Sequence, residues 1–216
     1  MTGDIEAAES LAPEIGIALS YTPAPVRGAL RAFFMLDRRL GQIVTQTSEP
    51  MLGQMRLAWW RDMFGTAVEQ RPTGDAVLDH LGTHWAGEEL ALVDLVNAWE
   101  ELLAEPPLPK QSARDFSARR AAGFAVIAHR AGHEGIDGAG ELWALADAAA
   151  HFPDGEERAM LITLAADYEP TPRLPRSLRG VAILDALAAR AIKDGGAPLM
   201  KGRGAALLAL KRGLLG

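Results

Sequence analysis

Apolar residues recur three and four positions apart along almost the whole chain, which is the spacing that places them on one face of an α-helix. Such runs cover residues 5–19, 27–45, 51–68, 75–85, 88–104, 112–131, 139–151, 156–167 and 177–193. Prolines and glycines separate the runs, and proline ends a helix because it lacks an amide hydrogen and has a fixed φ. No stretch shows the clear alternation of a strand. The pattern therefore predicts an all-α fold, a single-domain helical bundle of about eight or nine helices.

The composition restricts the classes of protein to which the chain can belong. Its 216 residues, 49% of them hydrophobic, are enough for one domain with one core. The formal net charge of −6 argues against nucleic acid as a partner. The chain has no cysteine, begins without the pattern of a secretory signal, and has no apolar run near the ~18–20 residues that span a bilayer. We expect a cytoplasmic protein whose main domain covers residues 1–197.

The segment from Ser48 to Asp62, SEPMLGQMRLAWWRD, places a permanent charge inside an apolar stripe. Pro50 suits the first turn of a helix, and residues four apart then share a face. Arg56 falls among methionines, leucines and tryptophans, where a guanidinium needs an anion. We expect Arg56 to be buried against an acid, with Asp37 as the first candidate, or alternatively to face an anionic ligand. The neighbouring apolar residues are expected to be buried against the helix 27–45; they are Met51, Leu52, Met55 and Trp59.

Two segments of the chain carry a specific pattern: YTPAPVRGALRAFF, residues 21–34, and EPMLGQMRLAWWRD, residues 49–62. Together they resemble the N-terminal half of squalene and phytoene synthase-like proteins. A weaker similarity continues in order through residues 95–103, 116–132, 139–153 and 174–190. The chain is most similar to the divergent branch that includes the mitochondrial complex I assembly factors. The resemblance implies the isoprenoid (terpenoid) synthase fold, in which helices surround a deep apolar cavity.

Active members of this family ionise a prenyl diphosphate with Mg²⁺ held between two acid-rich sequences. The positions that match the first of these here are Gly41, Gln42 and Thr45, none of which is an acid, and Arg39 stands where related members have a glutamate. In the second region, WALADAAAHFP at residues 143–153, Asp147 is the one acid. A two-sided Mg²⁺ site cannot be built from these residues.

The resemblance and the missing acids together lead to the expectation of a catalytically degenerate protein. Such a protein would bind a prenyl lipid or a protein partner as an assembly or regulatory factor, and it would need no cofactor. The candidate residues for an anion or for the cavity are Arg27, Arg56, Trp60 and Arg61. The alternative is an active prenyl transferase of carotenoid or hopanoid synthesis, with Mg²⁺ held by Asp37, Asp62 and Asp147.

Three further features admit functional interpretations. His80 and His84, and likewise His129 and His133, are four apart and could hold a metal ion, but solvated histidines at a helix end are the favoured interpretation. Residues 198–216 form a basic amphipathic tail. Its cations are Lys201, Arg203, Lys211 and Arg212. Either the tail attaches weakly to the inner face of an anionic membrane, or it packs on the domain as a last helix.

Overall fold

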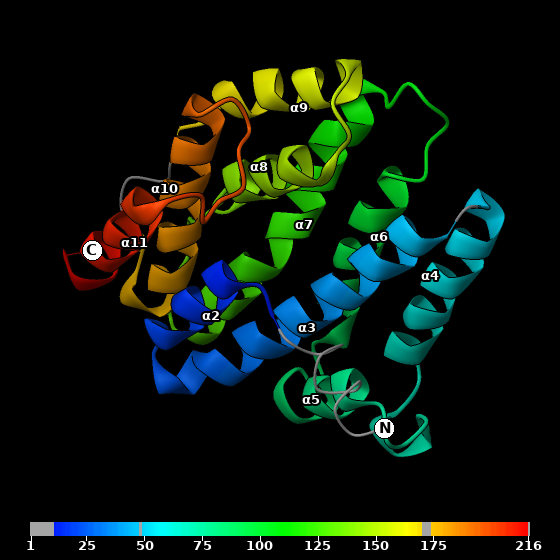
Figure 1. Cartoon of the computed structure of the whole chain (residues 1–216). Coiled ribbons are helices and arrows are strands. Elements are labelled where there is room, and N and C mark those ends of the chain that lie inside the picture. Colours follow the sequence, from blue (N-terminus) through cyan, green and yellow to red (C-terminus); the bar gives the residue numbers. More distant parts are fainter. Residues whose placement is uncertain (1–10, 48, 170–173, 216) are drawn as a thin grey trace, which may run out of the picture.

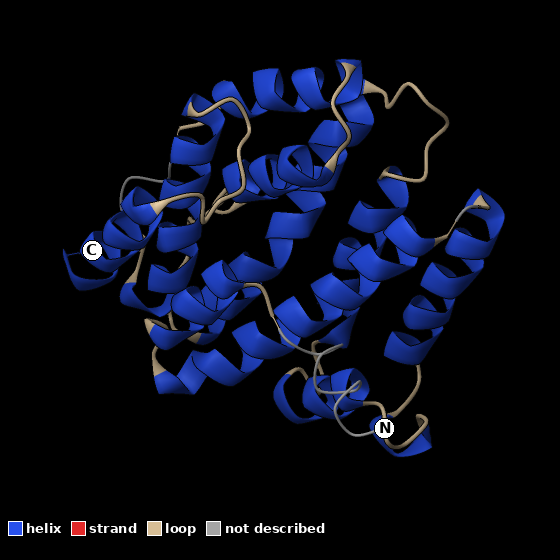
Figure 2. Cartoon of the chain, in the orientation of Figure 1, coloured by secondary structure: helices blue, strands red, loops and turns tan. Residues whose placement is uncertain are grey.

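The computed structural model describes residues 11–47, 49–169 and 174–215, and within these ranges it contains helices, turns and loops but no strand (Figures 1 and 2). The all-α prediction is therefore confirmed for the described residues. The α-helices are α2 (Pro13–Ser20), α3 (Ala24–Gln46), α4 (Pro50–Gly65), α5 (Ala76–His84), α6 (Val93–Glu101), α7 (Lys110–Arg130), α8 (Glu141–His151), α9 (Glu156–Ala166), α10 (Arg179–Lys193) and α11 (Arg203–Leu215). Three short 3₁₀ segments join them: η1 (Val68–Gln70), η2 (Glu89–Leu92) and η3 (Arg176–Leu178).

Proline sets the beginning of the first three helices. A proline occupies the first or second position of α2, α3 and α4, where its missing amide hydrogen costs no helical hydrogen bond. The predicted run 88–104 is divided into η2 and α6, and the part of the run 5–19 before Leu11 lies outside the described residues. Helix α3 runs through the middle of the molecule, and it contacts α2, α4, α5, α6 and α7 (Figure 1).

An aromatic cluster forms the core where α3, α7 and α8 meet. The ring centroids of Phe33 and Phe124 lie 5.0 Å apart, and those of Phe34 and Trp143 lie 5.6 Å apart. Gly123 of α7 lets the helices approach closely, because a Cβ atom there would come within 2.6 Å of the Phe33 ring. The cluster fixes the relative positions of the three helices that carry the polar residues described below.

The orientation predicted for α4 is wrong. Met51, Leu52, Met55 and Trp59 are 72%, 44%, 65% and 39% exposed. Helix α4 packs on α3 and α6 through the neighbouring row of side chains instead; its buried residues are Gly53, Leu57, Trp60 and Phe64. Both rows have helical spacing. Gly53 favours burial of the row to which it belongs, because the absence of a side chain lets α4 approach Leu103. A Cβ atom at position 53 would lie 3.0 Å from Cδ1 of Leu103.

The expected burial of Arg56 and its pairing with Asp37 are also wrong. Arg56 is exposed, and its Nη1 donates a hydrogen bond to Thr47 Oγ1 at 3.2 Å. Because Leu57 is at the centre of the packed face, the residue before it is turned about 100° away, toward solvent.

The C-terminal segment forms helix α11, which packs on α10 (Figure 1). Ala205 and Ala209 are fully buried or nearly so, whereas Leu207, Leu210 and Leu214 are 67%, 48% and 66% exposed. The tail is thus a last helix that keeps one apolar row at the surface. None of the described helices combines the length and the apolar character needed to cross a membrane.

Candidate functional site

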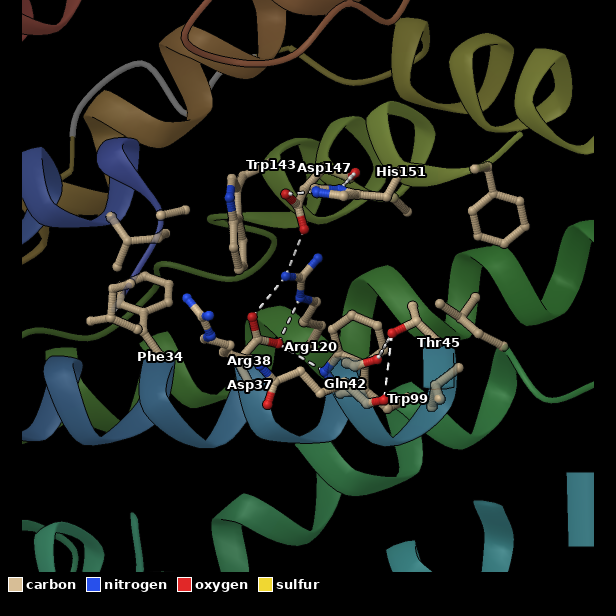
Figure 3. A pocket seen from close by; sticks show the side chains of 18 of the residues that line it. Phe34, Asp37, Arg38, Gln42, Thr45, Trp99, Arg120, Trp143, Asp147 and His151 are labelled. Carbon is tan, nitrogen blue, oxygen red and sulfur yellow. Dashed lines mark hydrogen bonds and ion pairs between the residues drawn. The ribbon is translucent and has the colours of Figure 1, made fainter. Parts of the chain in front are cut away.

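A cavity of about 490 Å³ opens between α2, α3, α6, α7 and α8 (Figure 3). Apolar side chains from all sides line much of it, among them Ile15, Phe34, Val44, Leu102 and Phe152. Its volume lies within the ~300–1,000 Å³ that is usual for small-molecule sites. The cavity is large enough for an apolar ligand, so its polar residues determine what chemistry is possible there.

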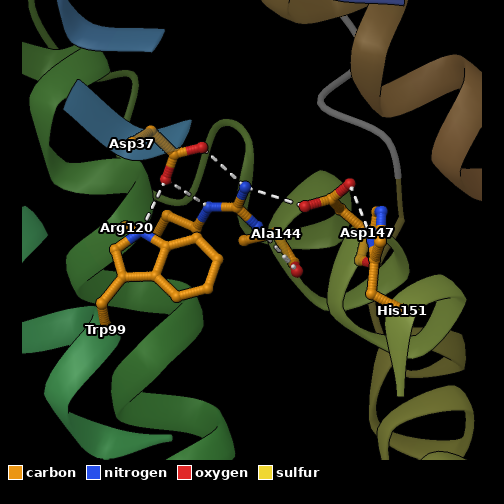
Figure 4. A network of polar contacts seen from close by, with 6 residues as sticks. All are labelled: Asp37, Trp99, Arg120, Ala144, Asp147 and His151. Carbon is orange, nitrogen blue, oxygen red and sulfur yellow. Dashed lines mark hydrogen bonds and ion pairs between the residues drawn. The ribbon is translucent and has the colours of Figure 1, made fainter. Parts of the chain in front are cut away.

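Two carboxylates reach the cavity from opposite walls, Asp37 from α3 and Asp147 from α8. Arg120 of α7 lies between them (Figure 4). Its Nε and Nη2 donate to the two oxygens of Asp37 at 2.8 and 2.7 Å, and Nη2 also lies 2.8 Å from Asp147 Oδ2. One guanidinium therefore bridges both acids, as a divalent cation would.

The bridge is buried and held in place by aromatic rings. The Arg120 side chain is 3% exposed, that of Asp37 is 7% and that of Asp147 is 16%. The guanidinium carbon lies 4.1 Å from the centroid of Trp143 and 4.9 Å from that of Trp99, at distances typical of cation–π contacts. Burial alone would lower the pKa of Arg120, but the charges of Asp37 and Asp147 outweigh it and raise that pKa above its usual value.

Trp99 of α6 lines the cavity and packs against α3. Its Nε1 donates to Asp37 Oδ1 at 2.9 Å, so this oxygen accepts from both Trp99 and Arg120. The ring lies against Gly41, where a Cβ atom would come within 2.9 Å of Cη2 of Trp99. A side chain at position 41 would therefore displace the indole and disturb its hydrogen bond to Asp37.

Two further charged residues line the cavity. Arg38, half-buried on α3, has a buried Nε without a hydrogen-bond partner among the described residues. Burial raises the pKa of Glu14, on α2, above its usual value of 4.5, and the negative charge of Asp147 raises it further. His151 lies at the rim, with Nδ1 3.6 Å from Asp147 Oδ1.

The candidate residues named from the sequence do not gather in one place. Asp37 and Asp147 line the cavity, whereas Arg27, Arg56, Trp60, Arg61 and Asp62 do not. Arg27 lies at a second groove, Trp60 is 2% exposed in the core, and Asp62 is exposed on α4.

Two arginines that could be read as anion-binding are paired elsewhere. Arg61 donates to Asn97 Oδ1 at 2.8 Å and forms an ion pair with Glu100, so it joins α4 to α6. Arg39 forms a 2.9 Å ion pair with Asp75, the N-terminal cap of α5. Both residues therefore hold helices together, and neither lines the cavity.

The sequence pattern gives no functional role to Arg120, and it predicts that Trp99 belongs to an ordinary amphipathic core. A signal for Arg120 is present, because Ala113, Phe116, Phe124 and Ile127 define the buried face of α7 and Arg120 lies on the same face. Its partners are 83 and 27 positions away in the chain, which no local pattern indicates.

The residues present do not fit Mg²⁺. In the part of the chain that the structure describes, no three His, Asp or Glu side chains are grouped so that they could hold a metal ion. Of the three carboxylates that line the cavity, Asp37 and Asp147 are already bonded to Arg120, and Asp37 also accepts a hydrogen bond from Trp99. The histidine pairs lie elsewhere: His84, His129 and His133 are exposed, and His80 is half-buried.

Comparisons with known proteins add no relative. No family model matches the chain, and searches of curated proteins and of solved structures find no match.

Proposed function

We propose that the chain is a catalytically degenerate squalene/phytoene synthase-like protein that binds a prenyl lipid in the cavity and acts as an assembly or regulatory factor. The observation that supports this most directly is the Asp37–Arg120–Asp147 bridge. A guanidinium held between two carboxylates balances one of their two charges, and because it is part of the chain it cannot be exchanged as a metal ion can. The apolar walls then bind the chain of the ligand, and Arg38, with its unpartnered Nε, suits an anionic head group.

Binding can be followed through tryptophan fluorescence, because Trp99 and Trp143 line the cavity. Farnesol and farnesyl diphosphate should each change the emission in a saturable way, with or without Mg²⁺. Val44→Trp places a large side chain in the cavity and should abolish this response. Val68→Trp is the matched control, because Val68 is 39% exposed and does not line the cavity. Equal responses of the two variants would refute binding in the cavity.

A second candidate function is an active prenyl transferase, favoured by the approach of Asp37 and Asp147 from opposite walls of the cavity. It requires Mg²⁺ to displace Arg120 from both acids. The protein is therefore incubated with farnesyl or geranylgeranyl diphosphate and Mg²⁺, and pyrophosphate release is measured. Release that depends on Mg²⁺ and is lost in Asp37→Asn would establish the transferase and overturn the degenerate assignment.

A further inference from the structure

A second groove, of about 700 Å³, lies apart from the cavity at the side of the molecule where α2, the start of α3, α10 and α11 come together (Figure 1). Its described lining includes Arg27, Arg176, Arg179 and His133 and contains no aspartate or glutamate. The chain as a whole has 28 acidic and 22 basic residues. A concentration of three arginines without an acid therefore runs against the composition and requires an explanation.

The three arginines have no carboxylate partner among the described residues. Arg27 donates through Nε to the backbone oxygen of Thr22 at 2.9 Å, and Arg176 and Arg179 form no side-chain hydrogen bond or ion pair within the described parts of the chain. Arg27 and Arg176 are exposed and Arg179 is half-buried. Some other arginines are paired with acids, for example Arg71 with Glu89 and Arg130 with Glu88. The groove thus presents guanidinium groups that are available to an external anion.

A buried hydroxyl in the same groove supports this interpretation. Ser177 is 7% exposed and lies in the lining between Arg176 and Arg179. Its Oγ is buried and has no hydrogen-bond partner among the described residues. A buried hydroxyl without a partner is unfavourable, and a bound anion would accept its hydrogen bond.

Two helices also begin at the groove. Helix α3 starts at Ala24 and α10 at Arg179, and neither has a side-chain cap or an acid in its first turn. The positive ends of both helix dipoles therefore add to the charge of the arginines.

Close packing gives the groove a defined shape. Gly180 of α10 touches α2, since a Cβ atom there would come within 2.5 Å of the backbone oxygen of Ala18. At Gly213 of α11 a Cβ atom would come within 2.5 Å of the Tyr21 ring. Both walls are thus held against the α2–α3 turn.

We infer that this groove binds a phosphate group, with Arg27, Arg176 and Arg179 as charge partners and Ser177 Oγ as a hydrogen-bond donor. The site is independent of the cavity and of the function proposed for it. The phosphate can belong to a free small molecule or to a lipid head group. The exposed Leu214 lines the groove, and Leu207 and Leu210 continue the apolar row along α11, which suits a lipid lying at a membrane surface.

Calorimetric titration with inorganic phosphate at constant ionic strength tests the site. Arg176→Gln with Arg179→Gln should weaken binding by about tenfold or more for each charge-assisted hydrogen bond lost. Arg114→Gln with Arg119→Gln is the control, since it removes the same charge from residues of α7 outside the groove and should leave affinity unchanged. Ser177→Ala should weaken binding without lowering the melting temperature, which distinguishes a ligand contact from a structural role.

Vesicles identify the source of the phosphate. If it is a lipid head group, vesicles that contain phosphatidic acid should bind the protein, and both the Arg176–Arg179 double variant and Leu207→Ser with Leu210→Ser should lose binding. If it is a free phosphate compound, inorganic phosphate binds and the vesicles do not. The inference is overturned if the groove variants and the Arg114–Arg119 control bind phosphate and vesicles equally, or if none of the proteins binds either.

Discussion

Replacement of Arg120 by methionine removes the cation of the cavity bridge while keeping an unbranched side chain of similar length. The change eliminates the contacts to Asp37 at 2.7 and 2.8 Å and the contact to Asp147 at 2.8 Å. Asp37 keeps the hydrogen bond from Trp99, but the two carboxylates then face each other without a counter-charge. Since their side chains are only 7% and 16% exposed, water can compensate for little of this loss.

The expected cost follows from the burial of the pair. Removing one partner of a buried ion pair costs about 3–5 kcal/mol of the free energy of unfolding. For a chain of 216 residues, each kcal/mol lowers the melting temperature by ~2–4 °C, so we expect a decrease of roughly 6–20 °C. Thermal unfolding followed by circular dichroism measures it. Arg119→Met, at the neighbouring position of α7, is the control and should change stability by about 0.5 kcal/mol at most.

A double-mutant cycle shows whether the loss comes from the bridge. Asp37→Asn keeps an oxygen that can accept from Trp99 and removes one of the two stranded charges. The variant with both Arg120→Met and Asp37→Asn should therefore be more stable than the sum of the two single effects, with a coupling of ~1–3 kcal/mol. Additive effects, or an Arg120→Met protein as stable as the control, would refute the structural role given to the bridge.

Three further outcomes are expected. A Mg²⁺ titration should leave the melting temperature of the native protein unchanged and should raise that of Arg120→Ala in a saturable way, because only the variant frees both carboxylates. A rise in the native protein would contradict the claim that Arg120 occupies both carboxylates. Because burial raises the pKa of Glu14, the folded state loses stability as pH rises above 4.5. Glu14→Gln should therefore melt higher than the native protein at pH 7 and equally below pH 4.5, and a lower value at pH 7 would contradict this. Gly41→Asp should lower the free energy of unfolding, measured with urea, by about 1–3 kcal/mol, because the new Cβ atom forces Trp99 to move. A variant as stable as the native protein would show that the indole moves freely.

The sequence predicts the limits of many helices well, because these limits have a local cause, but the described residues contain ten α-helices where about eight or nine are predicted. Pro50 begins α4, and the predicted run 139–151 becomes α8 at Glu141–His151. The periodicity does not show which face of a helix is buried when two apolar rows compete. In α4 the row through Leu57 is buried and the row through Met55 is exposed, and this outcome depends on contacts with α6 that lie about 40 residues further along the chain.

The candidate site is harder to predict than the fold, because its parts come from five helices. A charge in an apolar stripe does meet an anion in this protein, but the charge is Arg120 and not Arg56. Asp37, the acid expected to pair with Arg56, pairs with Arg120 instead. What the sequence lacks is the phase of each helix relative to its neighbours, and that phase decides which arginine meets the carboxylate.

Three features of the cavity depend on one another. Gly41 leaves the space that the Trp99 ring fills, Trp99 donates to Asp37, and Asp37 together with Asp147 holds Arg120. An acid introduced at position 41 would collide with Trp99, and removing Trp99 alone would leave Arg120 on both carboxylates. A metal ion at this position therefore requires at least the removal of Arg120, which is destabilising by itself. This mutual dependence is why the test on Arg120 bears on the proposed function as well as on stability.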